Sequence, residues 1–212
     1  MSVEVPATPR TRITAKARSL RFDSGSLSLD LVATVGRRPS TPVERLDGPE
    51  RLREWCAGVG LAPRDEEDPA ALLAALRELR GAAHDVVTAH LDDRAPRPES
   101  VDLVNALARV APPAPRLRTD ARGRLAHPPA PRLTAAELLS AVARDLIAVM
   151  ADPRTRALLR TCDAEICRMI YLDNGAGKGR PRKWCSMDRC GNSAKAARHR
   201  QRTAAPGPAA RS

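Results

Sequence analysis

Apolar residues recur at helical spacing in several segments of the chain, and these segments define the expected core. Over residues 70–91 one stripe collects aliphatic side chains, at Leu72, Leu76, Leu79, Ala83 and Val86. Residues three and four apart share one face of an α-helix, so this stripe predicts a long helix with a buried face. The same spacing predicts shorter helices over residues 51–61, 99–110 and 135–151. Thr134, followed by Glu137, adds a capping box to the last of them.

Two further segments predict extended structure. From Leu27 to Val32 leucines alternate with Ser28 and Asp30, a period of two that suits a short strand or an extended lead into a helix. Residues 117–127 read as a hairpin around Gly123. The expected fold class is therefore mainly α, with a helical N-terminal domain that carries a short strand or hairpin.

Composition refines this picture. Of the 212 residues 42% are hydrophobic but only 2% are aromatic, so the core must be built from aliphatic side chains that pack between helices. No run of about 18 apolar residues exists, and the first residues lack the apolar segment of a secretory signal. We therefore expect a cytoplasmic protein that does not enter a membrane.

Charge is distributed unevenly along the chain. The net charge of the chain is +11, but residues 21–159 carry no net charge. Residues 160–202, in contrast, hold eleven basic and four acidic side chains. Residues 1–20 carry a further excess of +3 and few large apolar groups, which predicts a disordered basic arm. A local excess of this size at the C-terminal end indicates a polyanionic partner such as DNA.

Four of the five cysteines lie in this basic region, as two pairs with four residues inside each pair: Cys162, Cys167, Cys185 and Cys190. Four thiolates complete a tetrahedral shell and leave no position for water, so the spacing predicts one structural zinc per chain. An iron tetrathiolate or an iron–sulfur cluster would use the same ligands. Buried thiols or a pair of disulfides are the remaining alternative, which a reducing compartment disfavours.

The rest of the chain offers little chemistry. Cys56 stands alone on an apolar helical face, where a small core residue is expected, and His84, His90 and His127 lack ligand spacing. No convergent nucleophile and base is visible, and the glycines near Lys178 lack the order of a phosphate-binding loop. We therefore expect no enzymatic activity.

Basic residues flank the second cysteine pair. A loop ends at Arg182 and Lys183, and the helix expected after Asn192 gathers cations on about one third of its circumference. A charged helix face is often merely solvated, but here it adjoins a metal-stabilised scaffold. The candidate DNA contacts are Arg182, Lys183, Lys195, Arg198, His199, Arg200 and Arg202. Trp184 could pack over the zinc site or stack on a base, and packing is favoured because so small a module has few other core groups.

These residues resemble a known zinc finger. The resemblance to the CGNR zinc finger is carried by Trp184-Cys185-Ser186-Met187, Cys190-Gly191-Asn192, Ala194-Lys195 and Ala197-Arg198-His199-Arg200. Members of that family carry Arg where this chain has Ser193. Residues 27–34 and the helix that ends at Leu61 resemble the ABATE domain, which accompanies this finger in bacterial stress-induced transcription regulators; Ala33 stands where that family often has Asn.

The resemblance implies four cysteine ligands and a DNA-binding role. The expected organisation is a disordered arm (1–20), an ABATE-like helical domain (21–154), a small treble-Cys-type zinc finger that ends in a basic helix (155–202) and a disordered tail (203–212). The alternative is a zinc-dependent protein-interaction module that docks on an acidic partner, such as a component of the transcription machinery. The oligomeric state does not follow from the sequence.

Overall fold

The computed structural model describes residues 13–114, 116–126, 131–174 and 180–204, without the side chains at positions 199, 201, 202 and 204. Its helices are α1 (Ala15–Arg18), α2 (Leu27–Val32), α3 (Pro49–Gly58), α4 (Pro69–Leu91), α5 (Pro98–Leu107), α6 (Ala135–Ala151), α7 (Pro153–Arg156), the π-helical turn η1 (Met187–Gly191) and α8 (Asn192–Ala204). Helices dominate, so the predicted mainly α class is confirmed. None of these described helices combines the length and the apolar character that crossing a membrane requires.

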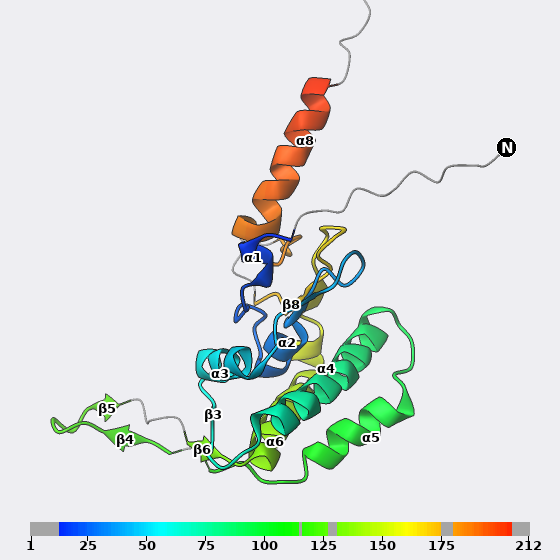
Figure 1. The fold of residues 1–212 in the computed structure, drawn as a ribbon. Helices are drawn as coiled ribbons and strands as arrows, with labels where there is room; N and C mark the ends of the chain where they lie inside the picture. Colours follow the sequence, from blue (N-terminus) through cyan, green and yellow to red (C-terminus); the bar gives the residue numbers. More distant parts are fainter. Residues whose placement is uncertain (1–12, 115, 127–130, 175–179, 205–212) are drawn as a thin grey trace, which may run out of the picture.

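The body of the molecule is a helical layer in which α4 packs against α2, α3, α5 and α6 (Figure 1). Four of the five residues of the predicted stripe of α4 are buried, with Leu76 and Leu79 fully inaccessible, whereas Val86 is half-buried. Leu138 and Leu146 of α6 face the same core, to which the fully buried Trp55 of α3 also belongs. The capping box of α6 forms as predicted, since Thr134 and Glu137 exchange side-chain and backbone hydrogen bonds.

The extended segment predicted over residues 27–32 is wrong, because these residues form α2. The Ser26 hydroxyl caps the helix by accepting a hydrogen bond from the Leu29 amide. Residues 28–32 are all buried, because α4, α6 and a strand of the finger surround this short helix. The polar positions are satisfied inside: Asp145 accepts from the Ser28 amide at 2.7 Å and Asp30 accepts from the Ser24 amide at 3.0 Å. The alternation of leucines with polar residues therefore belongs to a helix that is buried on every side.

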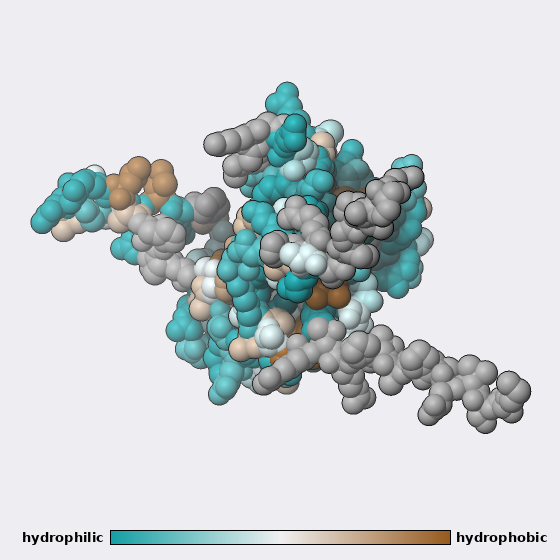
Figure 2. Space-filling model, turned by 90° about the horizontal axis from the view of Figure 1, so that it is seen from above, coloured by the Kyte–Doolittle hydropathy of each residue, from teal (hydrophilic) through white to brown (hydrophobic). Residues whose placement is uncertain are grey.

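The described strands are two or three residues long and form four two-stranded ladders, β1 (Val35–Gly36) with β2 (Val43–Glu44), β3 (Ala62–Pro63) with β6 (Arg132–Leu133), β4 (Arg118–Thr119) with β5 (Leu125–Ala126), and β7 (Leu159–Thr161) with β8 (Ile170–Leu172). The predicted hairpin is confirmed as β4 and β5, although residue 127 lies outside the described residues. This hairpin projects from the body and carries a hydrophobic patch, to which the exposed Leu117 and Leu125 belong (Figure 2).

The finger does not fold as a separate body. Leu159 of β7, together with Ile170 and Leu172 of β8, belongs to the same buried cluster as the helices. The helical domain is expected from the sequence to end at residue 154, but the β7–β8 hairpin, which follows that residue, is part of its core. Of the tail expected from residue 203, residues 203 and 204 continue α8 and the remainder lies outside the described residues.

The N-terminal arm also differs from the prediction over its described part. Residues 15–18 form α1, and Leu20 is buried in the core. Lys16 forms an ion pair with Asp188 of η1 at 2.5 Å, and Arg189 donates to the Lys16 carbonyl at 2.6 Å. The sequence suggested a disordered segment because its partners lie more than 160 residues away. Residues 1–12 lie outside the described residues.

Candidate metal centre and basic helix

The four clustered cysteines are presented by two local structures. Cys162 follows β7 and Cys167 lies in the turn before β8, where the Cys162 amide donates to the Met169 carbonyl at 2.8 Å. Cys185 precedes η1, and Cys190 lies within it and donates its amide to the Ser186 carbonyl at 3.1 Å. A strand hairpin and a helix start thus each supply two sulfurs.

The geometry of the sulfurs fits a tetrahedral ion. All four Sγ atoms lie within 4.8 Å of one another. The Sγ atom of Cys185 is 3.8 Å from that of Cys167 and 3.6 Å from that of Cys190. A tetrahedral shell with zinc–sulfur bonds of about 2.3 Å has edges of about 3.8 Å, whereas a disulfide would need about 2.05 Å. None of the five cysteines is disulfide-bonded, so the disulfide alternative is wrong, and the arrangement of the four sulfurs fits one structural zinc ion.

The surroundings of Cys185 favour its thiolate form. Hydrogen bonds from the thiols of Cys162, Cys167 and Cys190 hold the pKa of Cys185 far below its ordinary value, and the positive charge of Arg21 lowers it further. The Arg21 guanidinium is buried and donates from Nη1 to Cys185 Sγ at 3.3 Å. Its Nε and Nη2 donate to the Asp23 carboxylate at 2.8 and 2.5 Å. Arg21 therefore orients and stabilises a zinc ligand from outside the finger.

Sequence reasoning missed Arg21. It lies 164 positions before its sulfur partner, within the segment whose charges cancel. Its only local signal is the nearby Asp23, a pattern found on many solvated surfaces.

The predicted DNA contact Arg182 is instead part of the finger's internal framework. Its Nε donates to Asp173 Oδ1 at 3.1 Å, Nη2 donates to the Leu172 carbonyl at 2.8 Å, and the guanidinium lies 4.6 Å from the centre of the Tyr171 ring. The Tyr171 hydroxyl returns a hydrogen bond to the Arg182 carbonyl at 2.6 Å. These contacts hold the loop before Cys185 against β8.

The other candidates form an exposed basic surface. Lys183, Lys195, Arg198 and Arg200 are exposed, and the Arg198 guanidinium lies 5.7 Å from the centre of the Trp184 ring. The side chains of His199 and Arg202 lie outside the described residues. Trp184 packs against the cluster of Cys162, Tyr171 and Cys185, which confirms its predicted packing role.

The basic surface is carried on α8, which extends outward from η1 and away from the helical body (Figure 1). Close packing fixes its start: a Cβ on Gly191 would lie 2.5 Å from the Met187 sulfur and 3.3 Å from the Trp184 ring. Two further contacts tie η1 to α1, since Lys16 pairs with Asp188 and Arg189 donates to the Ser19 hydroxyl at 2.6 Å. The helix is therefore mounted on the metal centre and braced by the N-terminal segment.

Comparison with known protein families gives two matches. Residues 25–153 match the ABATE family, described as "Putative stress-induced transcription regulator". Residues 158–203 match the CGNR zinc finger. The curated proteins contain no match to the chain. The two matches cover the helical body and the metal centre respectively.

Proposed function

The chain belongs to the ABATE family and ends in a CGNR zinc finger, and from this premise we propose that it is a transcription regulator that binds DNA through α8. In this proposal it acts in the cytoplasm and is not an enzyme. The helical body senses or assembles, and the finger contacts the nucleic acid.

The observation that carries the proposal is that α8 points away from the helical body (Figure 1) and that all its charged residues are basic. The sequence of α8 contains four basic side chains and no acidic one. Lys195 and Arg198 are exposed and have no carboxylate partner among the described side chains. Because the cations are three residues apart, they lie on one face of α8 and can follow one groove of a duplex.

The metal centre supplies the rigidity that this surface needs. Cys190 lies in η1, which leads directly into α8, and Trp184 lies beneath Arg198, so zinc binding fixes the start of the helix before DNA arrives. Pre-organised cations lose less conformational entropy on binding than cations on a flexible tail. Phosphate contacts would supply most of the affinity, while a cation in the groove can read guanine.

The test is the salt dependence of DNA binding by a Lys195→Ala/Arg198→Ala double variant. Each cation placed against a phosphate contributes about 0.9 to the slope of log affinity against log salt, so the slope should fall by about 2. Alanine preserves helix propensity, and zinc content reports on folding. Fluorescence anisotropy on random and on selected duplexes, at several salt concentrations, measures both slope and sequence preference.

A matched control uses two exposed arginines on other surfaces, Arg53 on α3 and Arg122 on the β4–β5 hairpin. The Arg53→Ala/Arg122→Ala double variant removes the same net charge and should leave the slope unchanged. If the α8 variant retains its zinc and both its affinity and slope equal those of the control, the DNA-contact assignment is refuted. Binding to an acidic protein would then become the better account of this surface.

A further inference from the structure

A pocket of about 380 Å³ lies between the finger and the helical body. Ala17 of α1, Ala33 at the end of α2 and Val35 of β1 line one side. Ile166 and Met169 of the finger line the other side, next to the metal ligands Cys167 and Cys190. The volume is within the range of about 300–1,000 Å³ typical of small-molecule sites, and the walls between the charged groups are aliphatic.

One lining residue is a buried arginine, Arg37, with two guanidinium nitrogens that have no acceptor among the described residues. Arg37 is only 8% exposed, yet its Nε and Nη2 atoms have no acceptor among the described residues. Its backbone φ of +54° lies in the left-handed region, which non-glycine residues rarely adopt. A buried guanidinium that loses water without gaining acceptors is costly, and such exceptions call for a missing partner. The guanidinium therefore indicates an acceptor that enters the pocket from outside the chain.

Two further guanidiniums that line the same pocket, those of Arg45 and Arg189, have only neutral acceptors among the described residues. Arg45 donates to the Ala17 carbonyl at 2.9 Å and to the Ala33 carbonyl, and Arg189 donates to a carbonyl and a hydroxyl. Burial, together with repulsion from Arg21 and Arg189, lowers the pKa of Arg45 to about 10. Gly36 makes room for the Arg45 guanidinium, since a Cβ there would lie 2.2 Å from its Nη2.

The acidic groups in this region are already engaged. Asp188 lines the pocket and pairs with Lys16, while Asp23 pairs with Arg21. Arg37, Arg45 and Arg189 therefore have no carboxylate partner among the described residues. Converging cations without carboxylate partners favour a bound anion, and planar guanidiniums match carboxylate and phosphate oxygens in pairs.

We propose that this pocket binds a small organic anion, with its carboxylate or phosphate head against the Arg37 guanidinium and its apolar body against Ile166 and Met169. A DNA phosphate is a poorer candidate, because Arg37 is recessed and the backbone of a duplex is too bulky to enter a pocket of this size. The ligand would touch both the helical body and the first turn of α8, since Ser193 also lines the pocket. The site thus goes beyond the proposed DNA contact and gives the helical body a ligand that reaches the finger.

Calorimetric titration of the zinc-loaded full chain tests the proposal without DNA, so its failure is distinct from failure of DNA binding. The probes are hexanoate, hexyl phosphate and the neutral hexanol, which share one apolar body. At least one anion should bind at millimolar concentration or below, about tenfold or more tightly than hexanol, because a charge-assisted pair is lost with the alcohol. The comparison of hexanoate with hexyl phosphate identifies the preferred head group.

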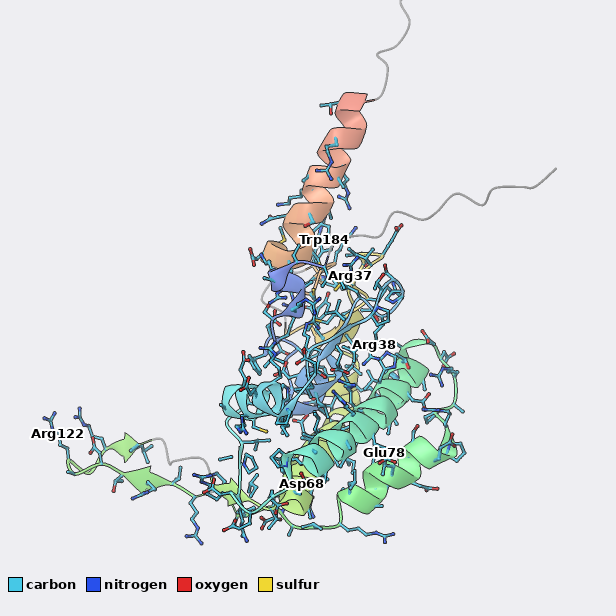
Figure 3. All side chains as sticks on the ribbon, in the orientation of Figure 1. Arg37, Arg38, Asp68, Glu78, Arg122 and Trp184 are labelled. Atoms are coloured by element: carbon cyan, nitrogen blue, oxygen red, sulfur yellow. The ribbon has the colours of Figure 1, made fainter. Side chains whose placement is uncertain are left out.

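Two variants locate the site, and a third is the control. Arg37→Gln should weaken anion binding by about tenfold or more, whereas Arg122→Gln, on the distant hairpin, should leave it unchanged (Figure 3). Ile166 is 49% exposed, so Ile166→Glu should fold and should repel the anion from the opposite wall. Zinc content and circular dichroism check each variant.

Two outcomes would overturn the proposal. The wild-type protein could bind neither anion more tightly than hexanol, or a folded Arg37→Gln or Ile166→Glu variant could bind the anion as well as wild type. If the first outcome is accompanied by a lower zinc affinity of Arg37→Gln, the guanidinium serves only to neutralise the negative zinc–thiolate centre.

Discussion

Replacing Arg21 by Met should weaken zinc binding although Arg21 is not a ligand. The buried guanidinium donates to Cys185 Sγ at 3.3 Å and is held in place by Asp23. Methionine has a similar length and no charge, so it fills the space and removes only the hydrogen bond and the positive charge. Thiolate character at Cys185, and with it zinc affinity, should decrease.

The expected magnitude follows from two independent considerations. A hydrogen bond to a charged group contributes about 1.5–3 kcal/mol, and loss of an outer-shell partner typically costs about 10–100-fold in metal affinity. These figures agree, since tenfold corresponds to about 1.4 kcal/mol. The stability of the zinc-free chain should change less, because the variant also removes the desolvation cost of a buried cation and leaves behind Asp23, whose side chain is 48% exposed.

Competition with a chromophoric zinc chelator at neutral pH measures the zinc affinity, and urea unfolding of the zinc-free protein measures its stability. Arg53→Met, an exposed arginine of α3, is the matched control and should behave as wild type. A zinc affinity of Arg21→Met equal to that of the control would refute the assigned role. The role would also be refuted if the loss in free energy of zinc binding were no larger than the loss in free energy of unfolding of the zinc-free chain.

Two further predictions concern thiols and pH. Thiol labelling followed by mass spectrometry should modify no cysteine rapidly in the zinc-loaded chain and four cysteines after chelation. The fifth, Cys56, should stay unlabelled because it is 1% exposed and burial raises its pKa to about 11. Rapid labelling before chelation would contradict the zinc site. Burial, with repulsion from Asp23 and Asp145, raises the pKa of Asp30 to about 6 from 3.8, so the folded state binds the extra proton and stability should fall by roughly 2 kcal/mol as pH rises from 4 to 6. Asp30→Asn should flatten this dependence in urea unfolding at pH 4 and 7, and an unaltered pH profile would show that another group titrates.

Local pattern was sufficient for the regular helices and for the metal ligands. The stripe of α4 and the capping box of α6 depend on interactions three or four residues apart, which the sequence displays directly. Cys162, Cys167, Cys185 and Cys190 could be identified because tetrahedral zinc needs four soft ligands and short loops bring each pair together. The same kind of pattern wrongly predicted extended structure where α2 forms, since a helix buried on all sides has no polar face to reveal its period.

Tertiary structure alone decided which charges are available and which are internal. Arg182 resembles Lys183 in the sequence, but only Arg182 lies over Tyr171 and beside Asp173. The pairing of Arg21 with Cys185 and the unsatisfied guanidinium of Arg37 at the pocket also follow from chain packing. The physical reason is range: helix periodicity and ligand spacing act within a few residues. Desolvation and ion pairing depend on which distant segments meet, and a linear pattern does not record that.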